Sequence, residues 1–180
     1  MWRQYFGGNA HIYGVDIQPE CLAYESDRVE VFIGDQGDRK FWQEFRTKVP
    51  RLDIVIDDGS HVPEHQRITL EELLPHLRPG GVFLTEDMHG NWVYGAMNPF
   101  ASYVHGLAHQ LNAMSATEAI DGNLGYSCAA QAFQSAVNSV HLYPFAAVIE
   151  RNEVAVDRLK APKQGTEWQP FNPGQPRANS

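Results

Sequence analysis

The stretch LDIVIDDGSH, residues 52–61, decides the fold class of this 180-residue chain. It begins with the mostly apolar, β-branched run 52–56 and continues directly into two carboxylates, a glycine, a serine and a histidine. An apolar run of this kind is typical of a buried strand in a parallel sheet. Because ligands of such sheets bind beyond the carboxyl ends of the strands, the acidic loop after residue 56 predicts a functional edge.

Three further segments repeat this organisation, a short apolar run that leads to an acid. They predict strands over 12–17 (IYGVDI), 29–34 (VEVFIG) and 81–85 (GVFLT). Helical periodicity between them predicts helices over 39–48 and 64–77, the second ended by Pro79-Gly80-Gly81. The alternation predicts an α/β protein with a Rossmann-like, mostly parallel sheet in which strands 52–56 and 81–85 are neighbours.

The second half of the chain predicts a different arrangement. Helices are expected over 101–114, interrupted by Gly106, and over 129–137. Two strands, 140–144 and 146–150, are expected to form an antiparallel pair that closes one sheet edge. We therefore expect one domain over residues 1–160, followed by a polar, Pro/Gly-rich arm over 161–180.

Composition excludes several classes of partner. The chain carries 14 Lys and Arg against 22 Asp and Glu, a net charge of −8, with no basic stripe that could neutralise phosphates. Nucleic acid and anionic membranes are therefore not expected as partners. The two cysteines, Cys21 and Cys128, are too few for a disulfide framework or a zinc site. No apolar run approaches the roughly 20 residues of a membrane span, so we expect a soluble, cytoplasmic protein.

Acidic residues at the ends of two strands suggest a metal site. If strands 52–56 and 81–85 are neighbours about 4.8 Å apart, Asp58 meets the pair Glu86 and Asp87 at one edge. Crowded carboxylates repel unless a cation neutralises them, and oxygen ligands suit Mg²⁺. We predict Asp58, Glu86 and Asp87 as metal ligands and His61 as the general base. The alternatives are that the acids only cap helices and turns, and that His61 only binds backbone.

A second group of residues suggests a nucleoside. An acid at the end of a strand in such a sheet commonly accepts hydrogen bonds from ribose hydroxyls, which assigns Asp16 to a ribose. Asp35 and Gln36, at the end of the next strand, could contact an adenine edge. Asp57 belongs to the same acidic rim and is grouped with these cofactor-binding residues. Together they predict an adenosine-bearing cofactor.

Four motifs carry a resemblance to a known family: GVDI at 14–17, GDQGD at 34–38, DIVIDDGSH at 53–61 and LTEDMHG at 84–90. They resemble class I S-adenosylmethionine-dependent methyltransferases, in particular the macrocin O-methyltransferase-like, metal-dependent sugar O-methyltransferases of macrolide biosynthesis. The resemblance covers residues 1 to about 95. It implies S-adenosylmethionine and Mg²⁺ as cofactors. It also implies the roles given above for Asp58, Glu86, Asp87, His61, Asp16, Asp35 and Gln36.

The sequence departs from the family at its amino terminus. The family begins with a strand and a Gly-rich loop that holds the methionine part of the cofactor, and GxGxG occurs nowhere in this chain. Residues 1–6 resemble the end of the helix that should follow that loop, and Gly7-Gly8 resembles a helix stop. We therefore expect an N-terminally incomplete domain whose sheet is without its central strand.

These observations predict an O-methyltransferase that acts on a hydroxyl of a small natural product, such as a sugar of a macrolide-like compound. Trp92, Tyr94 and Phe100 could cover this acceptor, although core packing explains them better. One rival is a cephalosporin-hydroxylase-like iron enzyme that would pair His61 with His65 or His89. An NAD-binding domain and a non-catalytic remnant or partner-binding module are the others. Trp168 and Phe171 are candidates for contact with a second copy in a homo-oligomer.

Overall fold

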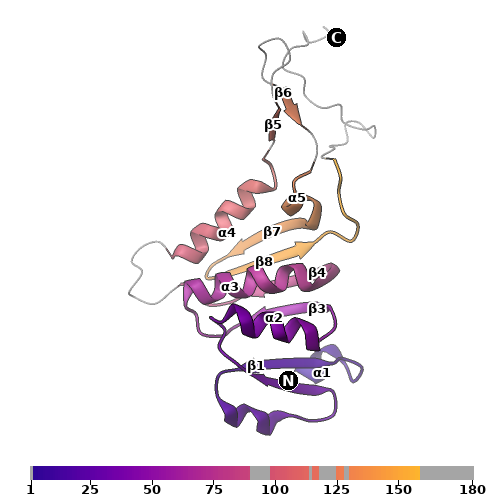
Figure 1. Cartoon of the computed structure of the whole chain (residues 1–180), viewed down its shortest axis with the longest axis vertical. Helices are drawn as coiled ribbons and strands as arrows, with labels where there is room; N and C mark the ends of the chain where they lie inside the picture. Colours follow the sequence, from indigo (N-terminus) through magenta and orange to yellow (C-terminus); the bar gives the residue numbers. More distant parts are fainter. Residues whose placement is uncertain (1, 90–97, 114, 118–124, 128–129, 159–180) are drawn as a thin grey trace.

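A computed structural model describes residues 2–89, 98–113, 115–117, 125–127 and 130–158. Helices and strands alternate through its first half, as the sequence predicts (Figure 1). The elements are α1 (Trp2–Phe6), β1 (Ile12–Asp16), η1 (Pro19–Tyr24), β2 (Val29–Ile33), α2 (Arg39–Lys48), β3 (Leu52–Asp57), α3 (Pro63–Leu73), η2 (Leu74–His76), β4 (Leu77–Thr85), α4 (Pro99–Gln110), β5 (Ser115–Thr117), β6 (Gly125–Ser127), α5 (Ala132–Ala136), β7 (Val137–Tyr143) and β8 (Ala146–Arg151). The predicted α/β, Rossmann-like fold is confirmed.

The main sheet has four strands in the order β3-β4-β8-β7. Strands β3 and β4 are parallel neighbours, which confirms the expectation on which the metal site depends. Strand β8 pairs with β4 and β7 pairs with β8, both antiparallel. The predicted antiparallel pair therefore does lie at one edge of the sheet, and its turn reaches the same end as the loops after β3 and β4 (Figure 1).

Strands β1 and β2 form a separate two-stranded parallel sheet. In the described part of the chain, β1 pairs only with β2, and β3 pairs only with β4. Helix α2 joins the two sheets, and its Phe45 packs edge-on against Phe32 of β2 with ring centroids 5.0 Å apart.

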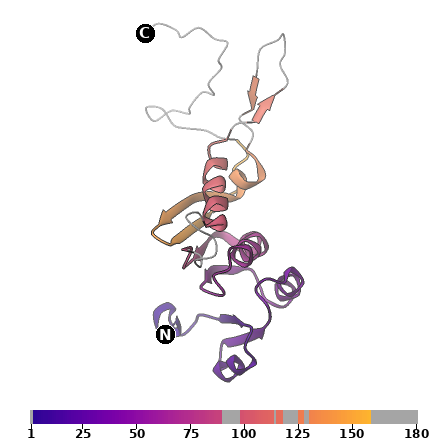
Figure 2. The same ribbon diagram turned by 90° about the vertical axis from the view of Figure 1, so that its left-hand side faces the viewer.

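The core lies between the four-stranded sheet and helices α2, α3 and α4. Its most deeply buried side chains include Leu70 of α3, Leu77 and Phe83 of β4, Phe100 of α4 and Ile149 of β8. Phe100 is only 1% exposed, so it belongs to the core and not to a cover over the acceptor. In both views the N-terminal half occupies one end of the long axis, and the β5–β6 pair occupies the other (Figures 1 and 2).

The structure differs from the sequence prediction around Pro79-Gly80-Gly81. Helix α3 ends at Leu73, and β4 already begins at Leu77, so this segment lies inside a strand. It forms a bulge there, because Leu77 pairs with Leu52 and Val82 pairs with Ile54. Gly80 has a φ of 74°, and its N–H donates to Asn152 O. A Cβ at Gly81 would lie 3.0 Å from Asp53 O, so only glycine permits this approach of β3 and β4.

Smaller differences concern the second half. Gly106 does not interrupt α4, which runs unbroken from Pro99 to Gln110. Residue 137, predicted as the end of a helix, begins strand β7. No helix in the described part of the chain has the length and apolar character that a bilayer crossing requires. The predictions for Trp92, Tyr94, Cys128 and the 161–180 arm, with its Trp168 and Phe171, lie outside the described residues.

Candidate active site

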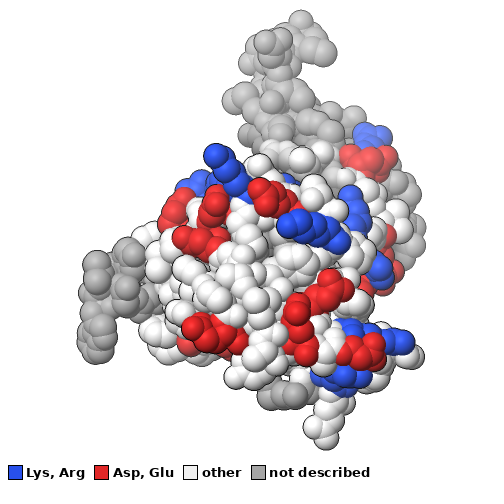
Figure 3. All heavy atoms as spheres, turned by 60° about the horizontal axis from the view of Figure 1, so that its bottom comes forward, with Lys and Arg blue, Asp and Glu red and all other residues white. Residues whose placement is uncertain are grey.

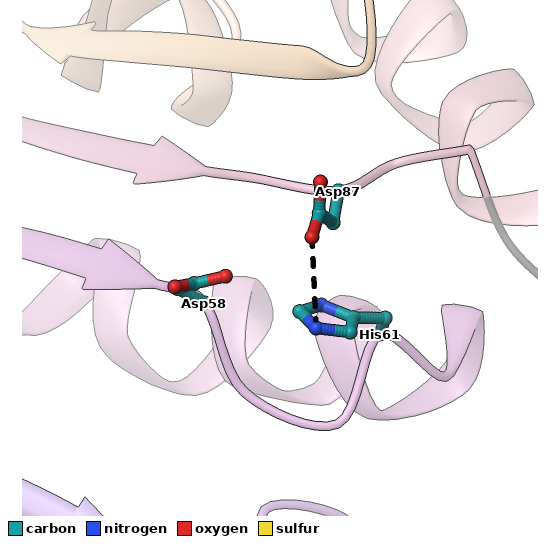
Figure 4. Close-up of side chains that lie close together, drawn as sticks. All are labelled: Asp58, His61 and Asp87. Carbon is teal, nitrogen blue, oxygen red and sulfur yellow. Dashed lines mark ion pairs between the residues drawn. The ribbon is translucent and has the colours of Figure 1, made fainter.

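The pairing of β3 with β4 brings their acidic ends together. Asp57 lies opposite Thr85 in the parallel register, and the N–H of Glu86 donates to Asp57 O across the two strand ends at 2.9 Å. The loops that follow therefore begin side by side. One ligand atom from each of Asp58, His61 and Asp87 lies within 4.8 Å of the others (Figure 4). We call this group the Asp58–His61–Asp87 cluster.

Two members of the cluster have strained backbones. His61 has a φ of 55° and Asp87 a φ of 52°, the left-handed region that residues with a Cβ rarely adopt. Each such residue costs about 1–2 kcal/mol and persists only where its surroundings hold it. His61 Nε2 lies 3.7 Å from Asp87 Oδ2, so the two strained residues present their polar atoms to each other. Strain of this kind concentrates at functional sites.

The predicted ligand Glu86 is not part of the cluster. Both of its backbone polar groups are hydrogen-bonded: its N–H donates to Asp57 O, and its carbonyl accepts from Gln66 Nε2 at 3.0 Å. Its carboxylate is not among the atoms that gather within 4.8 Å, whereas the imidazole of His61 is. The structure thus brings together Asp58 and Asp87 of the predicted ligand set and places the predicted base beside them.

Gln36 fixes the loop that carries Asp58 and His61. Its Nε2 donates to Asp57 Oδ1 at 2.6 Å, and its Oε1 accepts from the N–H of Ser60 at 2.9 Å. Its own carbonyl accepts from Trp42 Nε1 at 2.8 Å, which anchors Gln36 to α2. The predicted contact of Gln36 with an adenine therefore depends on the second N–H and the second lone pair of its amide.

Asp57 is a buried carboxyl with one unsatisfied oxygen. It is 4% exposed; Oδ1 accepts from Gln36, and Oδ2 has no hydrogen-bond partner among the described residues. Burial raises the pKa of Asp57 to about 6, against the lowering effect of the Gln36 and Gly59 hydrogen bonds. A buried oxygen without a donor is costly, so this position suits a ligand that brings one.

Asp16 and Asp35 lie after β1 and β2, in the other sheet. Asp16 Oδ1 accepts from Gln18 N at 2.8 Å, and this hydrogen bond is the main reason that its pKa is lowered. Asp35 is exposed, and its Oδ1 accepts from Gly37 N at 2.7 Å. Both carboxylates thus stabilise their own turns. Among the described contacts, neither joins the Asp58–His61–Asp87 cluster.

The two alternative histidines differ in their surroundings. His65 is engaged elsewhere, because its Nδ1 lies 3.0 Å from Ser60 Oγ. His89 lies beside the cluster, with Nδ1 3.7 Å from Asp87 Oδ1 and its ring 5.6 Å from the Phe145 ring. Phe145 comes from the β7–β8 turn, which no sequence signal linked to the site.

The charged surface agrees with the composition. Figure 3 shows acidic and basic side chains interspersed on the face turned toward the bottom of Figure 1, without a continuous basic stripe over its described residues. Salt bridges such as Arg39–Glu72, at 3.0 Å, and Arg78–Asp53, at 3.1 Å, pair several of the bases with acids.

Comparisons with known proteins find similarity to methyltransferases. No family model matches the chain. It is 42% identical over 88 residues to the demethylmacrocin O-methyltransferase of Streptomyces fradiae and 41% identical over 88 residues to the mycinamicin VI 2''-O-methyltransferase of Micromonospora griseorubida. Each match covers 49% of this chain but only 22% of the relative, so the chain spans about a fifth of the length of the curated relatives it matches.

A solved structure extends the likeness to most of the chain. The MycE methyltransferase of the mycinamycin biosynthetic pathway, in complex with Mg and SAH, superposes with a TM-score of 0.69 at 26% identity. The superposition covers 84% of this chain and 39% of that protein. The resemblance to the macrocin O-methyltransferase-like enzymes that the motifs predicted is therefore confirmed, in sequence over about half of the chain and in fold over most of it.

Proposed function

We propose that this chain carries the Rossmann-like unit of an S-adenosylmethionine- and Mg²⁺-dependent O-methyltransferase. Its acceptor would be a hydroxyl of a sugar on a macrolide-like natural product. The observation that carries the proposal is the Asp58–His61–Asp87 cluster at the carboxyl ends of two parallel strands. The names of its relatives, and a MycE complex that includes Mg, SAH and mycinamycin VI, support the reaction class.

The cluster fits a hard divalent cation. Two carboxylates face one another across the strand ends, and among the described residues no lysine or arginine lies within ion-pair distance of either. Oxygen ligands and a partly exposed position suit Mg²⁺. Asp58 and Asp87 would hold the ion, with Glu86 as the further ligand that the family resemblance implies. Bound there, Mg²⁺ would lower the pKa of a sugar hydroxyl.

The remaining roles belong to His61 and to the acidic and amide side chains that follow β1, β2 and β3. His61 Nε2 faces Asp87 Oδ2 and would take the proton of the acceptor hydroxyl. S-adenosylmethionine, when bound, would supply the methyl group that this hydroxyl accepts. Asp16 would accept from the cofactor ribose, and Asp35 with Gln36 would lie near its adenine. The unsatisfied Oδ2 of Asp57 would accept from a donor on the cofactor.

A direct assay tests the function. The chain is incubated with S-adenosylmethionine and either demethylmacrocin or mycinamicin VI, with Mg²⁺ or with EDTA. We expect a methylated product that forms only with Mg²⁺, and a melting temperature that rises with S-adenosylhomocysteine, because a ligand of the folded state stabilises it. Absence of both product and thermal shift would favour the non-catalytic remnant or partner-binding module.

A separate experiment tests whether His61 or Glu86 binds the metal ion. If His61 acts as base and not as ligand, His61→Ala should leave Mn²⁺ affinity within about threefold of the parent, whereas Glu86→Gln should weaken it by on the order of tenfold or more. Electron paramagnetic resonance of free Mn²⁺ measures both affinities. The opposite pattern would make the observed cluster, with its imidazole, the metal site itself.

Gln36 should position the metal-binding loop. Replacing it with leucine removes the two hydrogen bonds that hold Asp57 and Ser60, so the loop that carries Asp58 loses its support. We expect Mn²⁺ affinity to fall by about 10-fold, as for other residues that support metal ligands. Gln43→Leu is the matched control, because Gln43 is an exposed residue of α2. Equal affinity in the two variants would contradict the role.

One observation favours a second candidate function. His61 and His89 flank Asp87, each with a ring nitrogen 3.7 Å from one of its oxygens. Two histidines and one carboxylate are the ligands of non-haem iron oxygenases. Oxygen consumption that depends on Fe²⁺ and disappears in His89→Ala would favour this hydroxylase-like function over methyl transfer.

A further inference from the structure

Two arginines meet at the end of the main sheet that lies opposite the Asp58–His61–Asp87 cluster. Arg51 directly precedes β3, and Arg151 is the last residue of β8. Because β4 runs parallel to β3 and antiparallel to β8, strand β8 ends where β3 and β4 begin (Figure 1). The pairing of the strands therefore brings together two cationic side chains that are far apart in the sequence.

Both guanidinium groups contact the same two backbone carbonyls. Arg51 Nη1 donates to Pro75 O at 3.2 Å and to Leu77 O at 3.3 Å. Arg151 Nη1 also donates to Leu77 O, and it lies 3.5 Å from Pro75 O. These carbonyls belong to η2 and to the first residue of β4, so the backbone holds the two positive charges side by side. We call this arrangement the Arg51–Arg151 pair.

The pair has no acidic partner among the described residues. The arginines of α2, α3 and β4 each form an ion pair with a glutamate or an aspartate. Arg51 and Arg151 form none within the described part of the chain, and burial, followed by the charge of Arg51, lowers the pKa of Arg151. Two adjacent cations without a counterion are unexpected in a chain whose net charge is −8.

His76 gives a second sign of positive potential beside Arg51. Its Nε2 lies 3.0 Å from Pro50 O, next to Arg51 in the sequence. Burial and, to a smaller extent, the charges of Arg46 and Arg51 lower the pKa of His76, against the raising effect of its hydrogen bonds to the backbone. Two different groups, one on each side of Arg51, thus experience its charge without a carboxylate that offsets it.

The free donors of the pair suit an oxyanion. A guanidinium has five N–H donors in a planar fork, and the carbonyl contacts use one nitrogen of each arginine. The remaining nitrogens have no hydrogen-bond partner among the described residues. Arg51 is exposed and Arg151 is half-buried, so a ligand can approach from solvent. Phosphate oxygens match the guanidinium fork bidentately.

The charge of the pair favours phosphate over other anions. A phosphate group carries about −1.5 to −2 charges near pH 7 and presents at least three acceptor oxygens, enough for both guanidinium groups. A carboxylate has a single charge and two oxygens. Nucleic acid is less suited, because proteins that bind its backbone typically contact about 6–10 phosphates. The ligand class is therefore one phosphate group on a small molecule.

We propose that the Arg51–Arg151 pair binds a phosphate group, either free phosphate or the monoester of a small metabolite. The anion would accept from both guanidinium groups and so connect the start of β3 to the end of β8. Because it binds only where these strands have paired, it would stabilise the folded chain. The site lies at the other ends of β3 and β4 from the Asp58–His61–Asp87 cluster, and it does not depend on methyl transfer.

Calorimetric titration of the full chain with inorganic phosphate, and separately with glycerol 3-phosphate, tests the proposal. The buffer contains EDTA, so that phosphate cannot bind through a metal ion, and its ionic strength is constant. We expect Arg51→Gln and Arg151→Gln each to weaken phosphate binding by about tenfold or more, because each removes charge-assisted hydrogen bonds. Arg78→Gln is the matched control, since Arg78 is an exposed arginine of β4 that already pairs with Asp53.

Thermal unfolding without phosphate shows whether each variant is folded. If Arg151→Gln does not fold, Arg51→Gln decides the test, because Arg51 is exposed and lies outside every strand. Weakened binding in Arg51→Gln with unchanged binding in Arg78→Gln supports the site, and the tighter of the two probes shows whether its ligand is free phosphate or a monoester. No phosphate binding by the parent, equal binding in the parent and Arg51→Gln, or acetate binding as tight as that of phosphate would overturn the proposal.

Discussion

Asp87→Asn is expected to lower the affinity of the chain for Mg²⁺ and Mn²⁺ by on the order of 100-fold. Residues that merely support metal ligands cost 10–100-fold when removed, and Asp87 supplies one of the two carboxylates of the cluster. Asparagine keeps the size of the side chain and tolerates the φ of 52° at this position. The change therefore tests the charge and not the backbone.

Calorimetric titration with Mn²⁺ measures the effect, and thermal unfolding provides a second readout. A cation present at 100 times its dissociation constant should stabilise the parent by about 2.7 kcal/mol, and this gain should fall to about 0.4 kcal/mol in Asp87→Asn at the same concentration. Asp53→Asn is the matched control, since Asp53 is an exposed acid of β3 that pairs with Arg78. If Asp87→Asn and Asp53→Asn bind Mn²⁺ equally well, the assignment of a metal centre to the Asp58–His61–Asp87 cluster is wrong.

Neighbouring strands made the site predictable from sequence. The acids after two consecutive apolar runs had to converge once β3 and β4 paired, and the register of Asp57 with Thr85 places them there. The sequence could not show which of Glu86 and Asp87 faces Asp58, because that depends on the left-handed backbone at Asp87. Periodicity carries no information on such a local turn.

Contacts between segments that are far apart in the sequence could not be predicted either. Gln36 suggested a nucleoside contact from its place after a strand, whereas its amide holds Asp57 and Ser60, residues more than 20 positions away. Phe145 lies in a turn that any hairpin could contain, and the Met88–Phe145 hydrogen bond and the His89–Phe145 ring contact bring it to the cluster. The Pro79-Gly80-Gly81 segment predicted a turn because glycine and proline usually mark one, yet it forms a bulge inside β4, between the Leu52–Leu77 and Ile54–Val82 pairs.

Asp57 leads to a prediction about pH. In the folded chain its pKa is raised from 3.8 to about 6 by burial. Between these values the folded state keeps the proton that the unfolded state has released, so the free energy of unfolding falls as pH rises from about 4 to about 6. The loss amounts to on the order of 3 kcal/mol and persists at higher pH. Asp57→Asn, which cannot ionise, should lose this part of the pH dependence.

Urea unfolding at pH 4.5 and pH 7.0, in buffer with EDTA, measures this pH dependence of the free energy of unfolding. Other carboxyls such as Glu71, whose pKa is lowered, contribute the opposite slope, so the informative quantity is the difference between the parent and Asp57→Asn. Asp53→Asn should retain the slope of the parent. A parallel pH dependence in the parent and Asp57→Asn would show that the buried carboxyl does not titrate in this range.

The Asp57→Asn variant also tests how the chain binds its cofactor. A carboxylate with an unpartnered buried oxygen destabilises the chain at neutral pH, unless a bound ligand supplies a donor to that oxygen. The ammonium of S-adenosylhomocysteine is such a donor. We therefore expect S-adenosylhomocysteine to bind the parent at least 10-fold more tightly than Asp57→Asn at pH 7, since charge-assisted hydrogen bonds contribute about 1.5–3 kcal/mol. Equal affinities would assign Asp57 to the loop alone, as the acceptor for Gln36.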